Sequence, residues 1–348
     1  MKILIIRLSA IGDVAMTIPV IYAVAKAHPQ HSFTLLTQTF LIPVFINKPS
    51  NVDLIGINTY GAEKTFWGLV RFASAFSKYD YDVVLDLHHV IRSRILCLFF
   101  RLKGKKIHVL DKARRERKKL TAQEHKEKKQ IRPVVDRYAD VFRAAGLEYD
   151  GSFRSLFEES AAPEAKIGEL FGSKEGHWIG IAPFAKHKGK IYPPEEMEKI
   201  VDYFSRRENT TVFLFGGKGD EEQILSHWAS CYPQVNSIAG RLSLNDELAL
   251  MARLDVLLSM DSANMHFASL VETTVVSVWG ATHPFTGFYG YRQRPENAVQ
   301  LELDCRPCSV FGEKPCFRGD WACMAQLSID KIIAKLEQEL QTVRQELR

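Results

Sequence analysis

The beginning of the chain constrains its fold more than any other segment. Residues 3–6 form an uninterrupted apolar run, Ile-Leu-Ile-Ile, and a short polar loop then leads into residues with helical spacing. An aliphatic run without alternation is typical of a strand buried on both faces, as in a parallel sheet. Such sheets bind ligands at the carboxyl ends of their strands, where Asp13 falls. The loop has one glycine, too few for a dinucleotide or phosphate loop. We therefore predict a chemical role for Asp13.

Similar apolar runs recur along the chain with helical segments between them. They cover residues 32–37, 82–87, 106–110, 178–183, 210–215, 255–259 and 274–279. This alternation predicts an α/β protein with parallel sheets, and 348 residues are more than one ordinary core holds. We predict two Rossmann-like domains that face each other across a cleft, residues 1–165 and 166–325. A packed helix at 326–348 is expected to turn back toward the N-terminal domain.

Charge and hydropathy limit the class of protein. The net charge is +5, and lysine and arginine are concentrated between residues 101 and 132. Such a segment attracts polyanions such as an anionic membrane or a phosphorylated glycolipid, although charge runs are also common on ordinary solvated surfaces. No interleaved aromatic residues accompany it, which argues against nucleic acid as a partner. No apolar stretch is long enough to cross a bilayer, so we expect a cytoplasmic protein.

The second domain carries polar residues after several predicted strands. Asp261 and Ser262 follow one strand, and Ser262 is placed to cap a helix whose N–H groups would form an anion site. Lys188 and Lys190 follow another strand and suit a diphosphate. Glu222 lies in a first helical turn after Gly216-Gly217, where a carboxylate can accept hydrogen bonds from a ribose, although the helix dipole alone also favours acids there.

Four of the six cysteines lie near the C-terminus, at Cys305, Cys308, Cys316 and Cys323. The first pair has the C-x-x-C spacing, and a structural zinc ion is one interpretation of it. The later spacings are not those of a standard zinc ribbon. Reduced thiols that pack a loop are the alternative.

In order and spacing, these blocks resemble glycosyltransferase family 9, the inverting heptosyltransferase type of lipopolysaccharide core assembly. The resemblance spans nearly the whole chain. The blocks that carry it are residues 9–14, 84–87, 190–193, 216–217 with the acids that follow, 261–266, 280–284, 289–290 and 323–324. The chain departs from the family pattern at Ala263-Asn264, where Gly-Pro is usual, and at His283, where aspartate is common.

The resemblance implies a GT-B fold with an acceptor-binding N-terminal domain and a nucleotide-sugar-binding C-terminal domain. It implies that Asp13 is the general base. The donor-binding residues expected are Lys188, Lys190, Glu222, Asp261, Ser262, Ala263, Asn264 and His266. The acceptor-binding residues expected are Arg7, Ser9, Gly12, Arg114 and Arg115.

The expected activity is inverting, metal-independent transfer of heptose from ADP-heptose to a Kdo-lipid A type acceptor. The expected partners are an ADP-sugar, an anionic glycolipid and the cytoplasmic face of the inner membrane, and no cofactor is required. Three alternatives remain open: transfer of another nucleotide-activated sugar to a different surface glycan, a GT-B nucleotide-sugar epimerase, and a non-catalytic polyanion-binding module.

Overall fold

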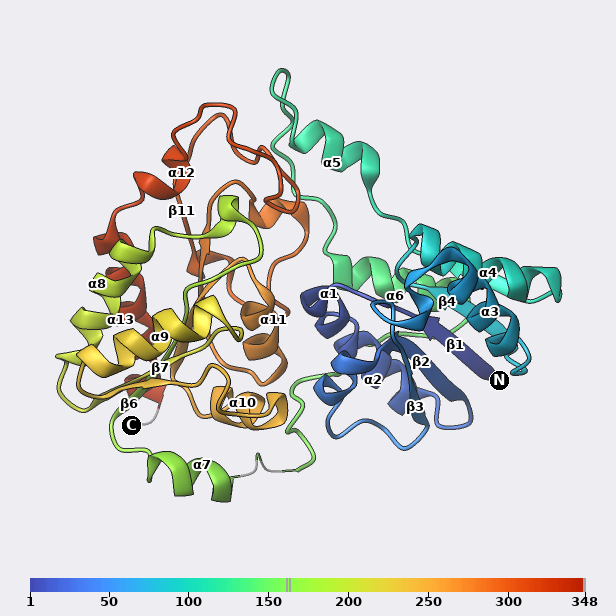
Figure 1. Ribbon diagram of the computed structural model, residues 1–348, viewed down its shortest axis with the longest axis horizontal. Helices are drawn as coiled ribbons and strands as arrows, with labels where there is room; N and C mark the ends of the chain where they lie inside the picture. The colour runs from blue at the N-terminus through green and yellow to red at the C-terminus, as the bar shows by residue number, and fades with distance from the viewer. Residues whose placement is uncertain (161, 163, 347–348) are drawn as a thin grey trace. The chain divides into compact units, whose positions relative to one another are not determined.

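The computed structural model describes residues 1–160, 162 and 164–346, and the chain divides into two compact units (Figure 1). One unit comprises Met1–Arg114 and Arg132–Glu159, and the other comprises Arg115–Ile131 and Ser160–Arg348. Each unit is built on a parallel sheet, which confirms the predicted α/β protein with two Rossmann-like domains. Residues 115–131 group with the second unit, although a boundary at residue 165 would assign them to the first.

The N-terminal unit has a five-stranded sheet in the order β3-β2-β1-β4-β5, with every pair parallel. Its strands are β1 (Lys2–Ile6), β2 (Ser32–Gln38), β3 (Val52–Ile57), β4 (Val83–Asp86) and β5 (Lys106–Val109). Its helices are α1 (Ile11–Ala15), α2 (Ile18–Ala27), α3 (Phe66–Phe76), α4 (Ile91–Leu102) and α6 (Val134–Ala144), with 3-10 turns η1 (Thr39–Val44) and η2 (Ala62–Lys64). Helix α5 (Arg114–Leu120) begins at the division between the units.

Strand β1 is the centre of this sheet, as its apolar run predicts. Residues Ile3, Leu4, Ile5 and Ile6 are fully buried, and β2 and β4 pair with β1 on either side. Ile6 lies opposite Asp86 in the register, so the loops that leave β1 and β4 emerge side by side. This pairing positions the polar residues of the N-terminal site.

The C-terminal unit has a six-stranded parallel sheet in the order β11-β10-β9-β6-β7-β8. Its strands are β6 (His177–Ala182), β7 (Thr210–Leu214), β8 (Val235–Ser237), β9 (Val256–Met260), β10 (Val275–Trp279) and β11 (Ala298–Gln300). Its helices are α7 (Glu164–Phe171), α8 (Pro194–Ser205), α9 (Asp220–Cys231), α10 (Leu244–Met251), α11 (Ala263–Leu270), α12 (Ala322–Ala325) and α13 (Ile329–Glu346). Its 3-10 turns are η3 (Lys188–Lys190), η4 (Pro284–Thr286) and η5 (Pro295–Asn297).

Helix α13 confirms the predicted C-terminal helix, and residues 347–348 of the predicted segment lie outside the described residues. Its buried residues Ile332, Leu336 and Leu340 join the core formed with β9, β10 and α8. The apolar face is therefore covered within the C-terminal unit, and the expected packing toward the N-terminal domain stays a prediction. In the described part of the chain, no helix is long and apolar enough to cross a membrane.

Candidate active site

In the N-terminal unit, the predicted base Asp13 forms an ion pair with Arg7. Asp13 lies in the first turn of α1, and its Oδ2 is 2.6 Å from Nη2 of Arg7, which follows β1 directly. Arg7 is buried, donates from Nη1 to the carbonyl of Leu87 at 2.7 Å, and lies over the ring of Tyr138. The Asp13 side chain keeps 21% of its surface exposed. The carboxylate is thus held in one place while remaining accessible to a substrate.

The loop after β4 places His88 near Arg7, and His88 was not among the predicted site residues. His88 is neutral at physiological pH, because burial, reinforced by the nearby cations Arg7, Lys112 and Arg92, lowers its pKa to about 2. The loop is shaped by the Asp86 carboxylate, which accepts hydrogen bonds from the backbone N–H groups of His88 and His89. The only available sequence signal was the pair of histidines at the end of a buried run.

The other residues expected to bind the acceptor occupy two different places. Ser9 and Gly12 lie in the loop and first turn beside Asp13, Ser9 half-buried and Gly12 buried. Arg114 and Arg115 are exposed at the start of α5, and the chain passes from one unit to the other between them. Arg7 is buried and contacts Asp13 itself, so its geometry suits positioning of the base.

In the C-terminal unit, residues after β6, β9 and β10 meet in one buried cluster. Lys190 Nζ lies 2.8 Å from Oδ2 of Asp261, and Thr282 donates its hydroxyl to the same oxygen at 2.7 Å. The Lys190 and Asp261 side chains are only 15% and 6% exposed. An ammonium group has three donors, so the contact with Asp261 leaves Lys190 able to bind an anion as well.

The N-terminus of α11 begins directly after this cluster. Ser262 occupies the N-cap position as predicted, but its hydroxyl contacts that of Ser259 at 3.2 Å and caps no N–H group. Since no side chain caps α11, its first N–H groups remain available to an anion. Ala263 and Asn264 form the accessible first turn, and His266 is buried in the next turn.

Glu222 and Lys188, which were expected to bind the donor, each contact other residues of the C-terminal unit. Glu222 accepts a hydrogen bond from the N–H of Gly219 at 3.4 Å, and its carboxylate fills the space beside Gly240. One hydrogen bond leaves the carboxylate capacity to accept others. Lys188 lies over the ring of Trp321, 5.7 Å from its centroid. Both residues can still contact a ligand, and their donor-binding role remains a prediction.

A buried arginine that was not predicted holds the turn after β10. Arg306 is 2% exposed and donates to the carbonyls of Gly280, Leu301 and Thr282. It thereby fixes the residue whose hydroxyl reaches Asp261. Its position between the two cysteines of the C-x-x-C pair was the only sequence signal, and that pattern had suggested metal binding instead.

His283 in the same turn should make the stability of the C-terminal unit sensitive to acid. Burial, together with Arg306 and Lys128, lowers its pKa to about 4, and its Nδ1 accepts a hydrogen bond from Phe285 N at 3.0 Å. Because the ordinary pKa of histidine is about 6.5, the unfolded chain binds the proton more readily. Neutral, buried His283 therefore contributes fully to the stability of the folded state above pH 6.5, and this contribution is lost as the pH falls through 4.

We expect the free energy of unfolding to fall by about 3 kcal/mol between pH 7 and pH 4 because of His283. His283→Asn keeps an acceptor for Phe285 N but does not titrate. Urea unfolding of both proteins at several pH values measures the difference. The titration of His88 contributes equally to both proteins and cancels in the comparison. Parallel pH profiles of the wild type and the variant would contradict this prediction.

In the described part of the chain, the C-terminal cysteines are not gathered into a metal site. All four are free thiols, and the described residues contain no group of three or more His, Cys, Asp or Glu side chains placed to hold a metal ion. Burial raises the pKa of Cys323 to about 11, so this thiol is protonated at neutral pH. The loop is held instead by contacts with the basic segment, since Lys126 donates to the carbonyls of Cys305 and Pro307.

Two Rossmann-like domains with polar residues at the carboxyl ends of their strands are the architecture of the GT-B class. The model of glycosyltransferase family 9 (heptosyltransferase) matches residues 69–315, so the chain belongs to this family and is a transferase. The match confirms the resemblance inferred from the sequence.

Individual proteins agree with this assignment. Lipopolysaccharide heptosyltransferase 3 of Escherichia coli K12 is 25% identical over 302 residues, which cover 83% of this chain and 84% of that protein. The family 9 glycosyltransferase of Veillonella parvula has a similar fold, with a TM-score of 0.76, 20% identity and coverage of 98% and 97%. E. coli heptosyltransferase WaaC, solved with ADP, gives a TM-score of 0.66 at 19% identity, with coverage of 97% and 100%.

Proposed function

We propose that this protein transfers heptose from ADP-heptose to a lipopolysaccharide inner-core acceptor of the Kdo-lipid A type, with inversion and without a metal ion. The observation that carries the proposal is the buried cluster of Lys190, Asp261 and Thr282 beside the uncapped N-terminus of α11. This arrangement suits a diphosphate. The similarity to E. coli lipopolysaccharide heptosyltransferase 3 and to WaaC solved with ADP supports the choice of substrates.

The C-terminal unit is proposed to hold the donor. Lys188 and Lys190 bind the diphosphate, and Glu222 accepts hydrogen bonds from the ribose. Asp261 orients Lys190, while Ser262, Ala263, Asn264 and His266 surround the diphosphate and the sugar. As the bond between the anomeric carbon and the phosphate oxygen breaks, negative charge grows on the leaving ADP. The ammonium groups and the N–H groups of α11 stabilise that charge.

The N-terminal unit is proposed to hold the acceptor, through Arg7, Ser9, Gly12, Arg114 and Arg115. Asp13 takes the proton of the acceptor hydroxyl while that oxygen forms its bond to the anomeric carbon. A single displacement, with one carboxylate acting as the base, inverts the configuration at the anomeric carbon. Since the acceptor is lipid-linked, we propose that the protein works at the cytoplasmic face of the inner membrane.

A panel of nucleotides tests the donor half of this proposal. ADP at 100 times its Kd should stabilise the protein by about 2.7 kcal/mol, and we expect UDP and GDP to have much smaller effects. Thermal unfolding with each nucleotide measures this. An equal response to UDP would contradict the choice of ADP.

Product analysis with ADP-heptose, with and without a Kdo-lipid A acceptor, tests the transfer itself. Conversion of the donor in the absence of acceptor would favour the epimerase alternative.

A further inference from the structure

Helix α4 of the N-terminal unit is apolar on two faces. Its inner face packs in the core through Leu96, Cys97 and Phe100. Its outer face carries an apolar ridge that we define as Ile91, Ile95, Leu98 and Leu102, of which Ile95 is half-buried and also packs against the core. The spacings of four, three and four residues place these side chains in one row along the helix. Ile91, Leu98 and Leu102 are 76%, 50% and 76% exposed. Because apolar side chains gathered on a surface are uncommon, the ridge requires an explanation.

The charged residues of α4 are all cations. Arg92 flanks the ridge on one side, and Arg94 and Arg101 flank it on the other. None of these three arginines forms an ion pair with any residue in the described part of the chain, and α4 itself has no acid. An occupant of this face must therefore combine an apolar body with negative charge.

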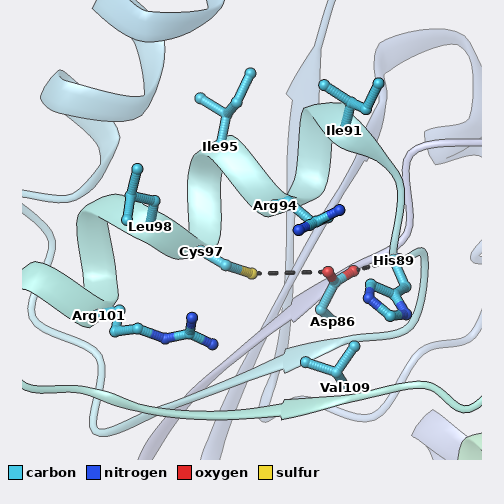
Figure 2. A pocket seen from close by; sticks show the side chains of 9 residues that line it. All are labelled: Asp86, His89, Ile91, Arg94, Ile95, Cys97, Leu98, Arg101 and Val109. Atoms are coloured by element: carbon cyan, nitrogen blue, oxygen red, sulfur yellow. Dashed lines mark hydrogen bonds between the residues drawn. The ribbon is translucent and has the colours of Figure 1, made fainter.

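A pocket of about 460 Å³ lies beside the ridge, between α4 and β5. Figure 2 shows Arg94 and Arg101 on the side of α4 nearer to Val109, and Leu98, Ile95 and Ile91 following one another along the helix. The volume is in the usual range for sites that take small molecules or parts of larger ones. Asp86 is the one acid among its lining residues, and it is 1% exposed. Ser93 and two backbone N–H groups donate to it. The accessible charge of the pocket is therefore positive.

The neighbouring helix α3 contributes exposed aromatic residues to the same helix pair. Helices α3 and α4 pack against each other, and α3 begins with Phe66 and Trp67, which are 59% and 76% exposed. Aromatic residues of this kind are enriched where proteins meet the interface of a bilayer. Basic side chains beside an apolar helical face are typical of helices that lie in that interface.

We propose that α4 and its pocket dock the protein on a membrane that contains anionic phospholipids. The ridge enters the interfacial layer, and Arg94 and Arg101 bind lipid phosphates. The inference rests on the proposed function for its biological reason, because a lipid-linked acceptor is met at a membrane. The chemical basis of the proposal is the apolar ridge of α4 with its arginines. Docking is therefore assigned to this helix and not to residues 115–131, where lysine and arginine are densest in the sequence.

Binding to vesicles tests the proposal on the full chain. The probes are vesicles of phosphatidylcholine alone and of phosphatidylcholine with phosphatidylglycerol. We expect the wild type to bind the anionic vesicles selectively, and Arg94→Gln/Arg101→Gln to bind them about thirtyfold more weakly. Ile91→Ser/Leu102→Ser removes the most exposed part of the ridge without touching the core, and should also abolish most of the binding. Lys118→Gln/Lys129→Gln removes the same charge from the exposed basic segment and should bind like the wild type.

Three results would overturn the proposal: unchanged vesicle binding by both α4 variants, an equal loss in the Lys118→Gln/Lys129→Gln control, or binding of acceptor glycolipid micelles with no binding of phosphatidylglycerol vesicles. Transfer to a deacylated, water-soluble acceptor separates this test from the proposed function. The α4 variants should retain that transfer. Failure of the wild type to transfer heptose would refute the proposed function, while the vesicle result would still decide the role of α4.

Discussion

Asp13→Asn is expected to lower the turnover number of heptose transfer by about 10²- to 10⁴-fold, the usual contribution of a general base. Asparagine has nearly the same shape, and its amide oxygen can still accept from Arg7, which lies 2.6 Å from the carboxylate in the wild type. It cannot take a proton from the acceptor hydroxyl. Affinity for ADP should be unchanged, because the proposed donor residues belong to the other unit.

Single-turnover kinetics with saturating ADP-heptose, together with ADP titration, measure both quantities. Asp140→Asn is the matched control, because Asp140 also pairs with arginines, Arg132 and Arg143, at 2.9 and 3.0 Å. This control should keep wild-type turnover. Near wild-type turnover of Asp13→Asn, in protein that still binds ADP, would refute the role of Asp13 as the base.

The parts of the fold that were predictable from the sequence depend on local patterns. Strand β1 is a continuous apolar run, and its central place in the sheet follows from burial on both faces. Strand β3 was not predicted, because Asp53 and Gly56 interrupt its pattern. Strands β8 and β11 were also missed, since each has three residues and lies at an edge of the sheet. Short edge strands are defined by their neighbours more than by their own sequence.

Candidate site residues could be selected from the sequence where they follow a strand, but not where they depend on a distant partner. Asp13, Lys190 and Asp261 were proposed from their positions after apolar runs, and their roles stay predictions. The hydrogen bonds of Arg306 to Gly280 and Thr282 join residues more than twenty positions apart, and no local pattern reveals them. The same applies to Lys126, which reaches the carbonyl of Cys305 across 179 positions and helps place the basic segment in the C-terminal unit.

Lys190→Met should have the second large effect, and it should act on turnover and on stability for different reasons. Loss of a cation that stabilises the leaving diphosphate is expected to lower turnover by about 10²- to 10³-fold, as for loss of other charge-stabilising groups. The substitution also leaves Asp261, 6% exposed, without its 2.8 Å partner. An uncompensated buried charge costs about 3 to 5 kcal/mol of the free energy of unfolding.

The double variant Lys190→Met/Asp261→Asn separates these two effects. With the buried carboxylate neutralised, most of the lost stability should return, while turnover should stay low because the diphosphate still lacks its cation. Lys174→Met is the matched control: Lys174 pairs with the buried Asp255 at 2.6 Å, just before β9, whereas Asp261 follows that strand. It should lose stability and keep its turnover. Urea unfolding and steady-state kinetics on the same preparations measure both. If the double variant regained wild-type turnover, Lys190 would serve only to neutralise Asp261, and stabilisation of the leaving group would have to come from α11 and Lys188.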